Sequence, residues 1–331
     1  MPTLVPRLIA GKRLNPVGLG CMSLSHGYYP RPDKKQSLAL LNHAIDIGYT
    51  HFDSARLYGL GENETLLSDV TKARRDEMFI TSKCGIVFDD GQRRIDCRPE
   101  TIRRAVDKSL KTLGVDNIDL YYLHRRDFDT PIEESVGTLA DLKAAGKIGA
   151  IGLSEMSSKT LRKAHAETPI DAMQSEYSLW TRNPEISVLE TCKELDVAFV
   201  AFSPVARGVL AGAVQDPQAL HENDLRRKQP RFSSEHWPAN LKRVNQFNTL
   251  AQLVDFTPAQ LSLAWVLSRG GHVHVIPGTT SIKHLEDNVA VLDMVIADEV
   301  LVRAGAIMNQ QTVSGHRYPE TMRKTIDTED F

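Results

Sequence analysis

The chain has 331 residues, enough to bury a large core in either one (β/α) barrel or two smaller domains. Hydrophobic residues make up 41%, charged residues 25%, and the formal net charge is −2, so no overall charge favours nucleic acid or a membrane surface. No apolar run approaches the roughly 20 residues of a membrane helix, and residues 1–10 do not resemble a signal peptide. The four cysteines lack metal-ligand spacing, so we expect free thiols, no metal and a cytoplasmic protein.

Strand-like and helix-like patterns alternate along the chain. A short hairpin around Gly11 and Lys12 is expected ahead of the first core strand. Apolar runs predict eight strands, at residues 17–22, 50–53, 77–83, 118–124, 147–153, 172–176, 197–202 and 273–276. Helical periodicity follows each strand, at residues 36–47, from 63 onward, and at 99–113, 132–145, 159–166, 184–195, 258–268 and 282–292.

This alternation predicts an α/β protein with a (β/α)8 TIM barrel fold. The strands recur at a spacing of roughly 25–45 residues, which suits a barrel of the usual size. A doubly wound sheet would need a G-x-G-x-x-G turn after its first strand, and that turn is absent. We therefore expect one domain over residues 1–331, with the barrel at about 14–292 and a polar tail at about 308–331.

A long polar insertion, residues 203–258, interrupts the pattern after the seventh strand. It leaves the carboxyl end of a strand, which is the face where barrel enzymes place their active sites. Loops of this length are usually functional or disordered. We expect it to be an active-site loop.

Four residues with acid–base chemistry stand at successive strand ends or on the loop above them. Asp53, Lys83 and His124 end the second, third and fourth strands, and Tyr58 follows Asp53 in a glycine-punctuated loop. A buried lysine beside an aspartate should form an ion pair, since a lone buried charge is costly. A nearby cation should lower the phenol pKa from its ordinary value of about 10 toward the working range of a proton donor. An ion pair that merely braces the barrel is the competing interpretation.

These segments resemble the aldo-keto reductase superfamily. The residues around the four candidates, 52–59, 80–83 and 120–124, are similar to the segments that carry the family's Asp, Tyr, Lys and His tetrad. Further family-like segments follow in order at 152–154, 174, 201–204 and 276–279. The resemblance runs from about residue 14 to 291 and is strongest to the bacterial and plant branch labelled auxin-induced-protein-like.

The resemblance implies an NADPH-dependent reductase that converts aldehyde or ketone carbonyls to alcohols by hydride transfer. Tyr58 would protonate the carbonyl oxygen, while Lys83 and Asp53 would lower the pKa of that tyrosine. His124 would orient the carbonyl or relay the proton. The implied partners are NADP and a small carbonyl substrate, with neither nucleic acid nor membrane, and the oligomeric state is left open.

The same resemblance assigns a cofactor site across the barrel top. Ser154 and Gln174 would hydrogen-bond the nicotinamide carboxamide, and the Phe202 ring would stack on the nicotinamide. The residues implied for the pyrophosphate are Ser203, Val205, Arg207 and Gly208, and those implied for the adenosine end are Thr279, His284, Asp287 and Asn288.

Some positions depart from the family pattern. Glu155 replaces an Asn that commonly follows Ser154, so no carboxamide contact is assigned to it. His284 stands where many members have an Arg against the 2′-phosphate, and Lys283 beside it could substitute. The two side chains favour NADPH over NADH.

Two other functions remain open from the sequence. Lys83 could form a Schiff base in a lyase, although its pairing with Asp53 would keep it protonated and therefore weakly nucleophilic. The chain could also be an NADP-binding regulatory subunit that senses redox state, as some relatives with this fold are. Nothing in the sequence names the substrate.

Overall fold

A computed structural model describes residues 6–89, 91–212 and 214–331, and it contains the predicted barrel. Eight parallel strands pair in the order β12-β11-β10-β9-β8-β5-β4-β3. A parallel bridge between Val17 and Val275 joins the first strand to the last, so the sheet closes. The strands are β3 (Leu19–Gly20), β4 (His51–Asp53), β5 (Phe79–Cys84), β8 (Leu120–Leu123), β9 (Ile151–Ser154), β10 (Ala172–Glu176), β11 (Ala198–Phe202) and β12 (Val273–Ile276).

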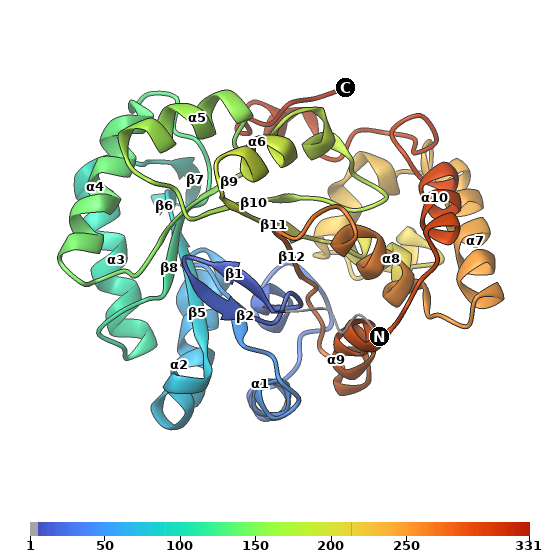
Figure 1. The fold of residues 1–331 in the computed structure, drawn as a ribbon, viewed down its shortest axis with the longest axis horizontal. Coiled ribbons are helices and arrows are strands. Elements are labelled where there is room, and N and C mark those ends of the chain that lie inside the picture. Colours follow the sequence, from blue (N-terminus) through green and yellow to red (C-terminus); the bar gives the residue numbers. More distant parts are fainter. Residues whose placement is uncertain (1–5, 90, 213) are drawn as a thin grey trace.

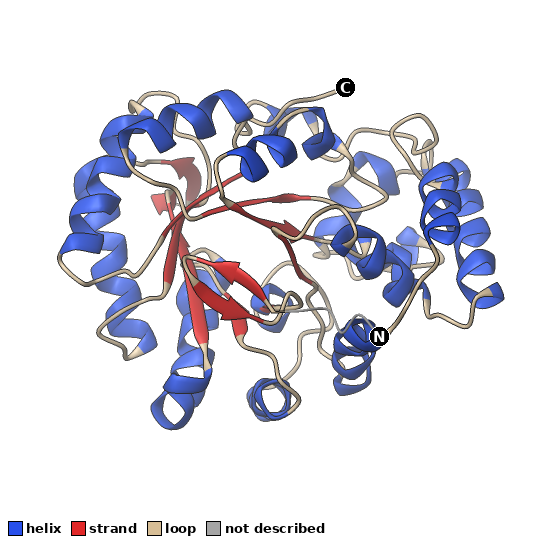
Figure 2. Cartoon of the chain, viewed as in Figure 1, coloured by secondary structure: helices blue, strands red, loops and turns tan. Residues whose placement is uncertain are grey.

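Helices surround the barrel, as Figures 1 and 2 show. They are α1 (Lys34–Asp46), α2 (Glu62–Arg74), α3 (Pro99–Leu113), α4 (Ile132–Ala144), α5 (Ser158–Glu167), α6 (Val188–Glu194), α8 (Pro258–Leu267) and α9 (Ile282–Val289). Their ends follow local sequence signals. Asp33 and Gln36 form a capping box at the start of α1, and Pro99 opens α3, which ends at left-handed Gly114. The eight strands and their helices were all predicted.

Apolar side chains form two cores. The larger lies between the strands and the surrounding helices, and the smaller fills the barrel interior. The amino-terminal hairpin, β1 (Arg7–Ile9) and β2 (Lys12–Leu14), lies across one end of the barrel (Figure 1). Its Ile9 and Leu14 join the interior core. The hairpin therefore closes the end of the barrel that lies opposite the carboxyl ends of the strands.

Two strands and three helices of the described residues lie outside the predicted pattern. They are the hairpin β6 (Ile86–Asp89) and β7 (Gln92–Ile95), and helices α7 (Trp237–Leu253), α10 (Asp298–Ile307) and α11 (Glu320–Arg323). The insertion over 203–258, expected to be a polar active-site loop, contains helix α7 in its second half. Trp237, Val244, Phe247 and Leu250 recur at helical spacing and are buried, so α7 packs through an apolar stripe. Helices α7 and α10 pack together outside α8 (Figure 1).

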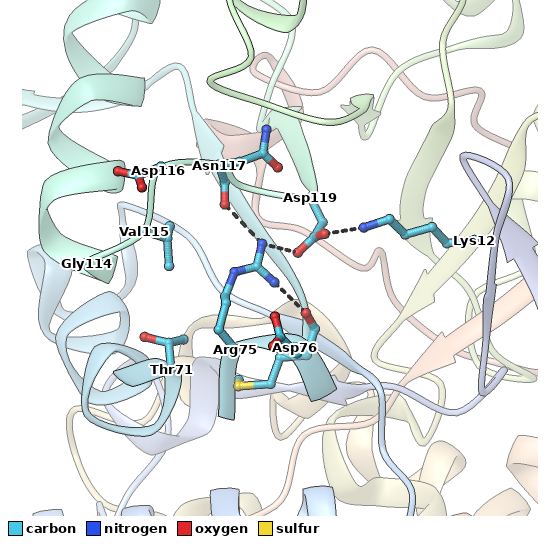
Figure 3. Close-up of a pocket in the computed structure, with 10 residues that line it drawn as sticks. Lys12, Thr71, Arg75, Asp76, Gly114, Val115, Asp116, Asn117 and Asp119 are labelled. Atoms are coloured by element: carbon cyan, nitrogen blue, oxygen red, sulfur yellow. Dashed lines mark hydrogen bonds and ion pairs between the residues drawn. The ribbon is translucent and has the colours of Figure 1, made fainter. Parts of the chain in front are cut away.

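A polar pocket lies at the amino-terminal ends of β5 and β8 (Figure 3). Buried Asp119 accepts from Lys12 Nζ at 2.6 Å and pairs with Arg75 Nη2 at 2.8 Å. Oδ2, the oxygen that pairs with Arg75, also accepts the backbone N–H of Ile80 at 2.9 Å. These charges satisfy one another and tie the hairpin to the barrel, and they lie at the opposite end from the four candidate catalytic residues.

Within the described ranges, no helix is long and apolar enough to cross a bilayer. All four cysteines are buried and unpaired thiols. Over the same residues, no three His, Cys, Asp or Glu side chains come together as a metal site.

Candidate active site at the carboxyl ends of the strands

The structure brings the four predicted acid–base residues together. Asp53 ends β4, Lys83 lies near the end of β5, His124 follows β8, and Tyr58 begins the short 3-10 turn after β4. All four side chains are buried. Lys83 Nζ lies 5.2 Å from the Tyr58 ring centroid, and the rings of Tyr58 and His124 meet edge to face at 6.0 Å.

The expected ion pair between Asp53 and Lys83 is present. Lys83 Nζ donates to Asp53 Oδ1, and it also donates to the carbonyl oxygen of Ser54 at 2.7 Å. The other carboxylate oxygen accepts from Thr81 Oγ1 and from Gln174 Nε2, each at 2.8 Å. Three polar contacts therefore fix Asp53, and this supports the buried lysine cation.

Burial controls the titration of this cluster. Burial and the negative charge of Asp53 raise the pKa of Tyr58 well above its ordinary value. Lys83 is expected from the sequence to lower this pKa, but burial is the larger effect in the structure. Burial also lowers the pKa of Lys83 despite its pairing with Asp53. Tyr58 is therefore a protonated phenol at neutral pH, as a proton donor must be.

His124 is held in its neutral form. Burial lowers its pKa well below the ordinary value, and the cations of Arg125 and Lys83 add to this effect. Its backbone N–H donates to the carbonyl of Cys84 at 2.9 Å, which fixes it at the edge of the sheet. A neutral imidazole can donate one hydrogen bond to a carbonyl and accept another.

The loop that carries Tyr58 has an unusual backbone. Gly59, Leu60 and Gly61 all have positive φ, at 57°, 53° and 104°. The φ of 104° at position 61 is one that side-chain-bearing residues rarely adopt, so glycine is favoured there, and the Arg56 guanidinium occupies the space that a Cβ would take. Arg56 in turn donates to buried Glu64 at 2.7 Å. These contacts hold the Tyr58 loop in one conformation.

Two of the predicted nicotinamide contacts adjoin the catalytic cluster. Ser154 and Gln174 are register partners on β9 and β10, and both are buried. Gln174 donates to Asp53, so the amide touches the tetrad directly. Phe202 ends the neighbouring strand β11, half-buried, with its ring against the interior core. The three residues lie side by side along the rim of the barrel.

The residues predicted for the pyrophosphate occupy a strained turn after β11. Ser203, Ala206, Arg207 and Gly208 all have positive φ, at 51°, 52°, 57° and 89°. Left-handed backbone at three non-glycine residues is costly and concentrates at ligand-binding segments. Val205 lies in the same turn, partly buried.

The residues predicted for the adenosine end lie on and before α9. Thr279 precedes the helix, and its carbonyl accepts from Ser23 Oγ at 3.4 Å. Lys283 and His284 are exposed on the first turn, and Lys283 Nζ pairs with Asp287 at 3.3 Å. Asn288 is buried and faces inward. This group leaves the barrel after β12, so the structure does not bring it to the tetrad.

A buried charge cluster at the barrel top was not predicted. Arg317 Nη1 lies 2.7 Å from Glu155 Oε2 and 3.4 Å from Glu176 Oε2, and Arg207 Nη2 lies 3.0 Å from Glu176 Oε2. Burial opposes ionisation of Glu176, but Arg207 and Arg317 outweigh it and lower its pKa to about 2. The only sequence signal was the carboxylate at position 155, which needs a cation that sequence reasoning could not locate.

This cluster attaches the carboxyl-terminal segment to the active-site face. Asp327 N donates to the Glu155 carbonyl at 3.2 Å, and Asp327 forms a parallel bridge with Met156. Tyr318 is also buried there, with the Arg317 guanidinium 4.7 Å from its ring centroid. The tail, which the sequence shows only as a polar segment, therefore covers the ends of β9 and β10.

Known proteins resemble this chain in sequence and in fold. A family model described as "Aldo/keto reductase family" matches residues 16–308. The chain is 39% identical over 320 residues to aldo-keto reductase yakc (NADP(+)) of Schizosaccharomyces pombe, covering 95% of this chain and 94% of that one. Among solved structures, a glycerol dehydrogenase from Gluconobacter oxydans matches with a TM-score of 0.84 and 26% identity, covering 93% and 95% of the two chains. An aldo/keto reductase from Klebsiella pneumoniae, solved with NADP and acetate, matches with a TM-score of 0.71 and 26% identity, covering 95% and 98%. The chain therefore belongs to the aldo/keto reductase family.

Proposed function

We propose that the chain, as one catalytic unit over residues 1–331, reduces aldehyde or ketone carbonyls to alcohols with NADPH. The observation that carries this proposal is the buried Asp53–Lys83 pair beside protonated Tyr58 and neutral His124. A phenol donor and an imidazole at one point are suited to activating a carbonyl oxygen.

The residues present fit a nicotinamide dinucleotide. Buried Ser154 and Gln174 offer a hydroxyl and an amide beside the tetrad, where a carboxamide could bind. The strained turn of residues 203–208 lies at the same rim, where Arg207 is paired with Glu176. The names of the relatives that mention NADP support the choice of dinucleotide. When bound, the cofactor supplies the hydride.

The residues of the chain would supply the proton and the geometry. Tyr58 donates its phenolic proton to the carbonyl oxygen as negative charge develops there, and His124 holds that oxygen by a hydrogen bond. Lys83 then stabilises the phenolate, because its cation lies against the ring and remains paired with Asp53. A Schiff base on Lys83 is disfavoured, since its ammonium is already engaged by Asp53 and Ser54.

The proposal is tested by following NADPH oxidation with a panel of aldehydes, ketones and α-dicarbonyls, and by identifying the alcohol products. We expect stoichiometric alcohol formation with at least one class of carbonyl. An enzyme that binds NADPH but turns over no carbonyl would instead support the redox-sensing alternative.

A further inference from the structure

Arg125 is a buried cation that the proposed mechanism does not use. It follows His124 directly, and its residue is only 7% exposed. Its Nη1 donates to the His124 carbonyl at 2.6 Å and reaches Ser154 Oγ at 3.5 Å. Its Nε is buried without any hydrogen-bond partner. The guanidinium thus lies between a tetrad residue and a predicted nicotinamide contact.

Three other arginines at this face have carboxylate partners, whereas Arg231 donates to two carbonyls and a hydroxyl. Arg317 and Arg207 pair with Glu155 and Glu176, and Arg226 pairs with Asp224 at 2.8 Å. Among the described residues, the contacts of the Arg125 guanidinium are instead a carbonyl and a hydroxyl. A buried cation without a counter-charge is costly, so its retention in an enzyme site points to an anion that arrives with a ligand.

A second cation, Arg93, lies near Arg125. The cation of Arg125 contributes to lowering the pKa of Arg93, on the hairpin strand β7, after the larger effect of burial. It also acts on Tyr58, His124 and Tyr318, so it faces the same space as the tetrad. The nearby carboxylates of Glu155 and Glu176 are already paired with Arg317 and Arg207.

We propose that Arg125 binds a carboxylate of the substrate, so that the preferred substrates are oxo acids: aldehydes or ketones that carry a carboxylate. This inference rests on the proposed carbonyl reduction. A guanidinium is suited to the task because its planar donors match the two oxygens of a carboxylate. Arg125 would bind the carboxylate of the substrate while Tyr58 and His124 hydrogen-bond its carbonyl oxygen.

The cofactor is a less suitable occupant. The pyrophosphate segment follows β11, which is separated from β8, the strand before Arg125, by β9 and β10. The nicotinamide carboxamide predicted to lie near Ser154 carries no negative charge. An anionic substrate is therefore the ligand whose chemistry matches the position of Arg125.

The test compares acids with their methyl esters, which keep the carbonyl but lose the charge. Suitable pairs are 4-formylbenzoate, 4-oxobutanoate and pyruvate, each with its ester. We expect kcat/KM with NADPH to favour the best acid over its ester by about 10–100-fold in the wild type, the range for a charge-assisted contact. Arg125→Gln should abolish this ratio, because the acid loses its charged partner and the ester has none to lose, and Arg125→Lys should keep part of it.

Arg126→Gln is the matched control. Arg126 carries the same charge one residue away, but its guanidinium is engaged by the carbonyls of Asp127 and Thr130. We expect the acid preference to survive in this variant. A wild type that reduces esters as well as acids would overturn the carboxylate site and leave the reductase intact, whereas a wild type inactive on every carbonyl would overturn both.

A binding measurement makes the result independent of turnover. In Tyr58→Phe enzyme loaded with NADP, the Kd of 4-formylbenzoate is measured by calorimetry with and without Arg125→Gln. We expect a rise of about 10-fold or more on loss of Arg125, with the Kd of NADP unchanged. An unchanged Kd for the acid, or a weakened Kd for NADP, would overturn the assignment to the substrate.

Discussion

Arg317 Nη1 lies 2.7 Å from Glu155 Oε2, although 162 residues separate the two along the chain. Both side chains are buried, and Glu155 sits in a left-handed conformation with φ of 55°. The contact ties the carboxyl-terminal segment to the end of β9, directly beside Ser154. The integrity of the active-site face thus depends on a residue beyond the family match at 16–308.

Loss of the Arg317 cation should therefore destabilise the protein strongly. Arg317→Leu leaves Glu155 and Glu176 buried with less positive charge, so we expect a loss of about 3–5 kcal/mol in the free energy of unfolding. Denaturant titration measures this loss. Arg323→Leu, which removes an exposed partner of Asp330 in the same tail, should cost at most about 1 kcal/mol. Equal losses in the two variants would contradict the role assigned to the buried pair.

The Asp53–Lys83 pair should show coupled effects on stability. Lys83→Met leaves the buried Asp53 carboxylate without a counter-charge. We therefore expect activity to be lost and the free energy of unfolding to fall by about 3–5 kcal/mol. Adding Asp53→Asn should restore part of the stability, because the stranded charge is removed, but none of the activity. Denaturant midpoints and NADPH turnover of the two single variants and the double variant provide the measurement. Additive losses of stability would contradict direct pairing.

Buried histidines should make the protein less stable in mild acid. Burial lowers the pKa of His51 to about 4 and that of His274 to about 3, from 6.5 in the unfolded chain. Because the folded pKa values lie below the unfolded value, their contribution is complete above pH 6.5. It is lost as pH falls through the window from 6.5 toward 4, by about 1.4 kcal/mol per pH unit for each group.

His51→Leu isolates this contribution. Neither ring nitrogen of His51 has a hydrogen-bond partner, so leucine leaves no polar group unsatisfied. Free energies of unfolding measured between pH 5 and 6.5 should show a shallower slope in the variant than in the wild type. Identical slopes would mean that His51 is not held neutral by the fold.

Cofactor preference should depend on the first turn of α9. Lys283 and His284 are the exposed positive or ionisable side chains where the family resemblance places the 2′-phosphate. We expect Lys283→Ala combined with His284→Ala to raise the Kd of NADPH by about 10-fold, at the low end for exposed charged contacts. The Kd of NADH should stay unchanged. The ratio of the two Kd values, measured by fluorescence titration, gives the result. An unaltered ratio would exclude both side chains from phosphate binding.

The barrel could be predicted from sequence because its signals are local. Strand β10 and helix α3 begin and end where the sequence predicts, since an apolar run fixes the strand and Pro99 and Gly114 bound the helix. The four acid–base residues could be predicted to lie together because parallel strands place their last residues on one rim of the barrel. Local pattern alone was sufficient for this part of the site.

The rest depends on contacts between distant residues. The local sequence around Glu155 or Arg317 does not predict their pairing. The local sequence around Tyr58 likewise does not predict the burial that raises its pKa. Helix α7 was missed for a different reason. Its apolar stripe of Trp237, Val244, Phe247 and Leu250 is visible in the sequence but is diluted by polar residues.

The central claim is that Tyr58 protonates the carbonyl as hydride arrives. Tyr58→Phe removes the phenolic proton and keeps the ring beside Lys83 and His124. Single-turnover oxidation of bound NADPH by a saturating aldehyde isolates this chemical step from product release. We predict a decrease in its rate of about 10²–10⁴-fold, with the Kd of NADPH unchanged. A single-turnover rate close to that of the wild type would contradict the account.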